Sequence, residues 1–130
     1  MATRRSQQAI LLNNTAVTGT NTYTSNWMDI SYANSVGAMI NFTGTMTGTI
    51  TVEVSYEATQ PGDPGQATPT NWKAVSFLVN SAVAANIAVS GAATHVLETG
   101  ITTATWFRVK YVNATNSGVI HIHAVAKTFA

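Results

Sequence analysis

One stretch of turn and strand residues occurs twice in this chain. Phe42–Val54 and Val112–Ala124 align on Gly48 and Gly118, and both copies read apolar-x-x-Thr-x-x-Gly-x-Ile-x-apolar-x-apolar. Alternation of apolar and polar residues after a glycine-containing turn is typical of a half-buried strand that leaves a hairpin. Two such hairpins predict two sheets, each built around one of them.

The rest of the sequence continues as short strands separated by Gly, Pro and Asn turns. Strands are expected at residues 9–12, 23–30, 36–43, 49–56, 72–80, 81–90, 94–98, 105–112 and 119–126. In the strand at 49–56, the residues expected to face inward are Ile50, Val52, Val54 and Tyr56, and those expected to face outward are Thr49, Thr51, Glu53 and Ser55. In the strand at 105–112, one face is expected to carry Phe107, Val109 and Tyr111, and the other Trp106, Arg108 and Lys110. Residues 13–21 are expected to form a loop or an irregular sheet edge. Eight or nine strands with almost no helix predict an all-β fold, a two-sheet antiparallel β-sandwich that is jelly-roll-like.

A single domain accounts for the whole length. We expect residues 1–8 to form a flexible N-terminal arm that carries Arg4 and Arg5, and residues 9–130 to form one β-sandwich domain. Residues 60–70 hold all three prolines, and proline is excluded from the interior of a strand or helix. This segment is therefore predicted to be a long exposed loop.

The composition limits the partners that this chain can have. Only 8% of the residues are charged, so charge repulsion does little to oppose association. Such a surface favours coverage in an assembly, or belongs to a small extracellular module with a bland exterior. The net charge of +1, with Arg4 and Arg5 as the only cluster of cations, argues against nucleic-acid binding. No long apolar run predicts a signal peptide or membrane span, so synthesis in a cytoplasm is expected.

The sequence offers little catalytic chemistry, and we expect no enzyme activity, no catalytic residues and no cofactor. The chain has no cysteine, and neither a nucleophile elbow nor a phosphate-binding loop occurs. His121 and His123 point the same way on a strand and could share a metal ion, with Glu53 as a third ligand. The alternative, which we favour, is that they are polar residues of an outward face, and no metal site is assigned.

Three tryptophans, Trp27, Trp72 and Trp106, are the candidate interface residues. Aromatic rings can stack on sugars, which would suit a glycan-binding surface. They can equally anchor a core or a subunit interface, where tryptophan is enriched. The second role is the one that we favour.

Two parts of the chain resemble small tailed-phage virion β-sandwich proteins. In the first part, Thr105–Val112 is followed by the turn Asn113–Gly118 and by an alternating final strand that ends at Lys127. In the second part, Thr47–Ser55 precedes a loop and the Asn71-Trp72 strand start. The loop at residues 60–70 is longer than is usual in that family.

This resemblance implies a structural protein of a bacteriophage virion, made in the host cytoplasm. The favoured role is a capsid decoration or cement protein, a homotrimer that binds the major capsid protein. The arm with Arg4 and Arg5 would then grip the shell. The alternative is a tail or fibre-associated adhesion module that binds a host glycan.

Overall fold

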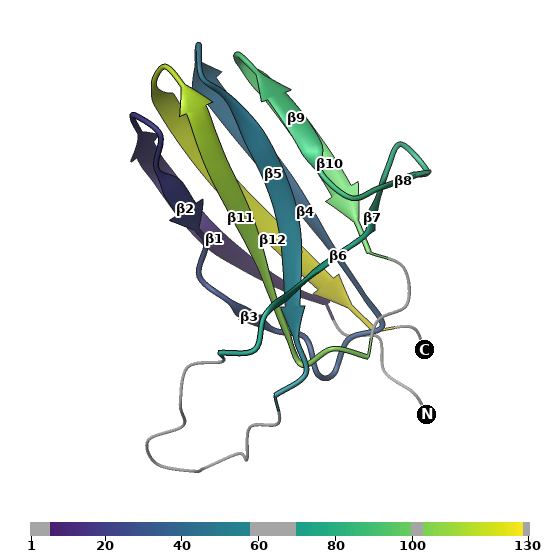
Figure 1. Ribbon diagram of the computed structural model, residues 1–130. Coiled ribbons are helices and arrows are strands. Elements are labelled where there is room, and N and C mark those ends of the chain that lie inside the picture. The colour runs from purple at the N-terminus through teal and green to yellow at the C-terminus, as the bar shows by residue number, and fades with distance from the viewer. Residues whose placement is uncertain (1–5, 58–69, 100–102, 129–130) are drawn as a thin grey trace.

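The computed structural model describes residues 6–57, 70–99 and 103–128, and these residues form strands but no helix (Figure 1). Two antiparallel sheets pack face to face, which confirms the predicted two-sheet β-sandwich. Sheet A has the order β1 (Ser6–Val17), β12 (Gly118–Lys127), β4 (Ser35–Gly44), β10 (Ala93–Glu98), β7 (Phe77–Val79) and β8 (Ala82–Ala84). Sheet B has the order β2 (Thr22–Thr24), β11 (Trp106–Thr115), β5 (Thr47–Ser55) and β6 (Lys73–Val75), while β3 (Met28–Asp29) also pairs with β11 and β9 (Ile87–Ser90) with β5.

The core lies between the two sheets and is formed by alternate residues of their long strands. Phe107, Val109 and Tyr111 of β11, which the alternation placed on one face of the strand, face inward. In β4, Ala38, Ile40 and Phe42 also face inward, while Met39 lies on the outer face. The rings of Phe42 and Tyr111 meet across the core with centroids 4.9 Å apart, so the two sheets are joined by aromatic packing.

The prediction that each repeat forms a hairpin within its own sheet is wrong. In both copies the chain leaves one sheet and enters the other: β4 pairs with β12 in sheet A, and β5 pairs with β11 in sheet B. Each repeat is therefore an arch over one end of the sandwich. Met46, in the first turn, is completely buried, and burial of this side chain is favoured where the turn crosses between the sheets.

The two arches meet at the same end of the molecule. Gly118 lies opposite Gly44 in sheet A, and the backbone nitrogen of Thr45 donates to the oxygen of Ser117. Because β4 corresponds to β11 and β5 to β12 in the repeat, an approximate two-fold relation exchanges the central strands of the two sheets.

Strand boundaries differ from the prediction at several places. β1 begins at Ser6, so the described part of the expected arm, residues 6–8, is paired strand, while Arg4 and Arg5 lie outside the described residues. β1 also continues to Val17 through two register shifts, which makes the stretch from residue 13 an irregular sheet edge. The expected strand at 23–30 is divided into β2 and β3. Of the predicted loop at residues 60–70, only Thr70 lies within the described residues.

The end of β5 departs from strict alternation. Tyr56 was expected to face the core but is 63% exposed, whereas Ser55 was expected to face outward and is completely buried. Ser55 lies opposite the half-buried Trp106, and its hydroxyl accepts a hydrogen bond from the Glu57 backbone. Because β5 ends at Ser55, Tyr56 lies beyond the strand, and the strand's alternation of side chains no longer determines its orientation.

Candidate functional site

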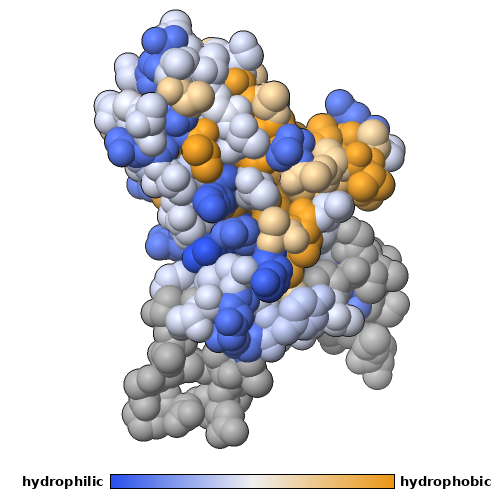
Figure 2. All heavy atoms as spheres, in the orientation of Figure 1, coloured by the Kyte–Doolittle hydropathy of each residue, from blue (hydrophilic) through white to orange (hydrophobic). Residues whose placement is uncertain are grey.

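Sheet B and the residues just after β5 carry most of the charge that the structure describes. Eight described residues are charged, and six of them belong to strands of sheet B or lie within two residues of the end of β5: Asp29, Glu53, Glu57, Lys73, Arg108 and Lys110. Glu53, Arg108 and Lys110 lie on the outer face of the sheet, whereas Lys73 lies opposite the buried Val54, on the inner side of edge strand β6. Sheet A carries the other two, Glu98 and Lys127. Figure 2 views the sheet B side, where hydrophilic side chains gather over the middle of β11 and β5.

Arg108 is the centre of this face. It lies opposite Glu53 on the neighbouring strand, and its Nε donates to the Glu53 carboxylate over 2.9 Å. Its guanidinium carbon also lies 4.1 Å from the centroid of the Trp72 ring. Both charged side chains are largely shielded from water, with exposures of 21% and 13%. The ion pair and the stacking on the indole ring together hold the Arg108 side chain in one geometry. A side chain that is already ordered loses little conformational freedom when a partner binds.

The three predicted tryptophans all lie beside this cluster. Trp106 is in β11, and its Nε1 donates to the backbone oxygen of Glu57 over 3.2 Å. Trp27 is 42% exposed and directly precedes β3, which pairs with β11 on the side away from β5. Trp72 directly precedes β6. The structure thus brings together on sheet B three aromatic side chains that are far apart in the sequence.

Glu57, two residues after the end of β5, binds Thr70 and Asn71 through its carboxylate. Its carboxylate accepts hydrogen bonds from the backbone nitrogen of Thr70 at 2.6 Å, from the Thr70 hydroxyl at 2.9 Å and from the Asn71 amide at 3.0 Å. These bonds, those of Thr70 first, hold the pKa of the Glu57 carboxyl below its usual value. One carboxylate therefore holds residues 57 and 70 together.

A hollow of about 400 Å³ opens next to this carboxylate. Val54 and Val75 form its apolar wall, and Tyr56, Glu57, Asn71 and Lys73 complete the lining. An exposed aromatic ring beside carboxylate, amide and ammonium groups can contact a polyhydroxylated ligand by stacking and hydrogen bonding.

The histidine pair does not meet the predicted third ligand. His121 and His123 do lie on the outward side of β12, as expected. His121 Nδ1 accepts from the Asn14 backbone nitrogen at 3.3 Å, and His123 Nε2 lies 3.1 Å from Gln8 Oε1. Glu53 is in the other sheet and bound to Arg108. Within the described residues, no group of three His, Cys, Asp or Glu side chains could hold a metal ion.

His95 is placed differently from the other two histidines. It faces inward from β10, edge-on to the Phe42 ring at a centroid distance of 5.8 Å. Its Nε2 is buried and finds no hydrogen-bond partner among the described residues. Burial lowers the pKa of this imidazole, because the interior disfavours the charged form.

Sequence reasoning missed the Arg108–Glu53–Trp72 cluster. Alternation placed Glu53 outward on its strand and placed Arg108 on the face of its own strand that also carries Trp106 and Lys110. Their contact depends on the pairing of β5 with β11, which no local pattern specifies.

No helix among the described residues is long and apolar enough to cross a membrane. No protein-family model matches the chain, and no curated protein sequence matches it significantly.

Two solved structures share the fold. The SPBc2 prophage-derived protein YomS aligns with a TM-score of 0.63 at 8% identity, over 98% of this chain and 97% of that one. A chain from the structure of infectious bursal disease virus, Gx strain, aligns with a TM-score of 0.53 at 13% identity, over 96% of this chain but 32% of that one. At these identities the likeness shows the fold alone.

Proposed function

We propose that this chain is a structural protein of a bacteriophage virion, and more narrowly a decoration or cement protein that binds the capsid shell. The observation that carries the proposal is the difference between its two outer faces. Sheet B presents tryptophan, arginine and paired charges, while sheet A presents a nearly uncharged face. Trp and Arg are the residue types that dominate protein interfaces. A rigid sandwich with two unlike faces is suited to join two kinds of neighbour.

The comparisons support this proposal through the sources of the two similar structures, a prophage and a virus. The match to YomS spans nearly the whole of both chains. Sheet B is the surface proposed to meet the major capsid protein, with Trp27, Trp72 and Trp106 as its anchors. Arg4 and Arg5, which lie outside the described residues, are proposed to extend this contact. The homotrimer implied by the resemblance remains a prediction, and the pair of copies inferred below is the alternative to it.

The direct test is to locate the protein in particles of the phage or prophage that encodes it. Immunogold labelling over the capsid shell is the expected result, and absence from purified particles would refute a virion role. Shells that lack the protein should rebind it from solution. Trp72→Ala and the double variant Arg4→Ala/Arg5→Ala should weaken rebinding, whereas Val83→Ala, at an exposed position of β8, should leave it unchanged.

A second candidate function is glycan binding by a tail or fibre component. The hollow with Tyr56, Glu57, Asn71 and Lys73 favours it. However, Arg108 lies over the Trp72 ring, so that face of the ring cannot stack on a sugar. Gold label at the tail, together with a glycan-array signal that Tyr56→Ala abolishes, would favour this role over the capsid role.

A further inference from the structure

A row of three apolar side chains and one histidine crosses the outer face of sheet A. Ile10 lies opposite His123, His123 opposite Met39, and Met39 opposite Val96, so four neighbouring strands each contribute one residue. Ile10, Met39 and Val96 are 53%, 42% and 53% exposed. The flanking rows are almost uncharged: Gln8, Val125 and Gly37 on one side lead to Glu98, and His121, Asn41 and Thr94 lie on the other.

We infer that two copies of this chain pair through this face, sheet A against sheet A. The low charge of this face indicates which surface can pack against it. The face carries one Lys and one Glu among the described residues, Lys127 and Glu98, both near its margin. It therefore fits a surface that is equally neutral. The outer face of sheet B holds the Arg108–Glu53 pair. If this pair were buried against apolar side chains, the free-energy cost of removing its charges from water would exceed the attraction between them. Of the two outer sheet faces in the described part of the chain, that of sheet A is the one that matches itself.

The area approaches that of a stable pair. Three strands of about ten residues and the six-residue β10, about 4.8 Å apart and at about 3.4 Å per residue, span roughly 590 Å². Projecting side chains raise the accessible area above this planar value. A standard interface takes roughly 800 Å² from each partner. The two faces would pack about 10 Å apart, as the sheets of a sandwich do.

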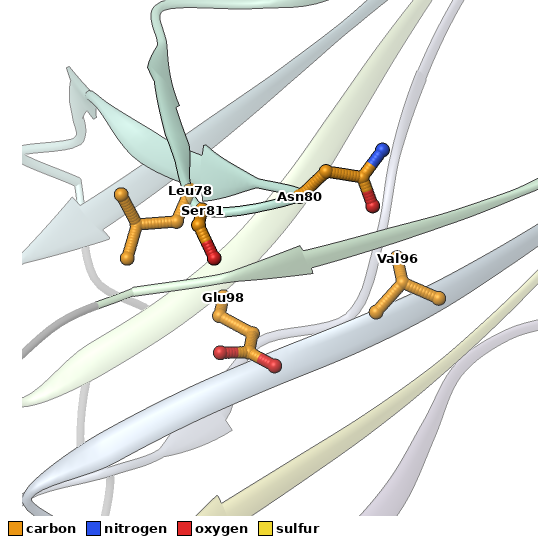
Figure 3. A pocket seen from close by; sticks show the side chains of 5 residues that line it. All are labelled: Leu78, Asn80, Ser81, Val96 and Glu98. Atoms are coloured by element: carbon orange, nitrogen blue, oxygen red, sulfur yellow. The ribbon is translucent and has the colours of Figure 1, made fainter.

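A hollow at one end of the row specifies the orientation of the pair. Val96, Glu98 and Leu78 line it together with Asn80 and Ser81, and it has a volume of about 170 Å³ (Figure 3). Asn80 and Ser81 form a two-residue turn in which both φ values are positive, at 50° and 68°. This is the turn that the twist of a tight hairpin favours, so the wall of the hollow is well fixed.

A two-fold axis parallel to the strands brings opposite ends of the row together. Ile10 of each copy then enters the hollow beside the partner's Val96, and His123 meets the partner's Met39. Gln8 comes opposite the partner's Glu98, where its amide nitrogen can donate to the carboxylate. Contacts in which residue i meets j and j meets i are those of an isologous dimer.

The first test is the mass of the purified chain in solution, by light scattering or sedimentation. We expect twice the 13.7 kDa of one chain. Val96→Lys places two ammonium groups in the interface and should raise the dissociation constant about 100-fold or more. Val112→Lys is the matched control, because Val112 is a half-exposed strand valine on the outer face of sheet B, and this variant should remain paired. A monomer or trimer for the parent, or a Val96→Lys variant that still pairs, would overturn the inference.

The second test fixes the geometry with disulfides, since the chain has no cysteine of its own. Ile10→Cys with Val96→Cys should give a covalent dimer on oxidation. The two positions are three strand spacings apart in one chain, about 14 Å, which is too far for an internal disulfide. Ile10→Cys with Val112→Cys should not cross-link. A dimer from Ile10→Cys alone would overturn the proposed axis. Because both tests use the chain alone, their failure is distinct from failure to attach to particles.

Discussion

Tyr111 Oη donates a 2.9 Å hydrogen bond to Asn113 Oδ1, and both side chains are buried. The Asn113 amide nitrogen donates in turn to the backbone oxygens of Gly19 and Asn116. One side chain thus joins β11 to the turn after β1 and to the turn of the second arch. Every polar atom of this amide has a partner, which is the condition for a polar group to be tolerated in a core.

Asn113→Ala should destabilise the protein strongly, because it leaves the Tyr111 hydroxyl and two carbonyl groups without their partner. We expect a loss of about 2–4 kcal/mol in the free energy of unfolding. Tyr111→Phe removes one hydroxyl and should cost about 1 kcal/mol. Urea denaturation followed by tryptophan fluorescence measures both. Equal losses for the two variants would contradict the central role of the amide.

The glycines of the repeat are required by close backbone approach. A Cβ atom on Gly118 would collide with the backbone oxygen of Thr43, and one on Gly48 with that of Val112. Gly118→Ala should therefore cost about 3 kcal/mol or more, since a backbone must move. Gly91 is the control: its φ is +77° but nothing lies within 4 Å of an added Cβ, so Gly91→Ala should cost only about 1 kcal/mol. Thermal unfolding of both variants tests the difference.

These glycines also show how far the sequence could lead. The period of two residues correctly placed Phe107, Val109 and Tyr111 on one face of their strand, because side chains of a strand must alternate, and the structure shows that this face is the buried one. A hairpin and an arch share the same local pattern of strand, turn and strand. They differ in pairing, such as that of Gly48 with Asn113, which lies beyond any local window. The row from Ile10 to Val96 was missed for the same reason: each residue is unremarkable alone, and only the register aligns them.

The Arg108–Glu53 pair should stabilise the fold modestly. A double-mutant cycle with Arg108→Ala and Glu53→Ala should give a coupling free energy of about 0.5–1 kcal/mol, because the pair is partly shielded but lies at the surface. Arg108→Lys keeps the charge but loses the planar group over Trp72, so it should not restore full stability. Lys110→Ala, at the next outward position of β11, is the control and should change stability by less than about 0.5 kcal/mol. A coupling near zero would show that the contact is incidental.

Acid should weaken the hydrogen bonds that Thr70 donates to the Glu57 carboxylate. The pKa of Glu57 is lowered by its Thr70 hydrogen bonds, so their contribution is present above the unfolded pKa, near 4.5, and is lost as the pH falls through the lower folded pKa. The protection of the Thr70 amide against hydrogen exchange should fall over this range. The Thr99 amide, which donates to the Val36 backbone oxygen, has an acceptor that does not titrate and should keep its protection. In Glu57→Gln, protection of Thr70 should be lower at neutral pH and insensitive to acid.

His95 should make the stability of the core depend on pH in a higher range. Its pKa is lowered in the folded state by burial, so below the ordinary value of 6.5 the unfolded chain binds a proton that the folded chain does not. The free energy of unfolding should therefore decline as the pH falls from 6.5 toward the folded pKa, and level off below it. His95→Gln cannot titrate and should lose this part of the decline, while His121, His123 and the carboxylates remain common to both proteins. Urea midpoints at pH 5.0 and 7.5 measure the effect, and parallel changes in the two proteins would show that His95 takes up its proton equally well when folded.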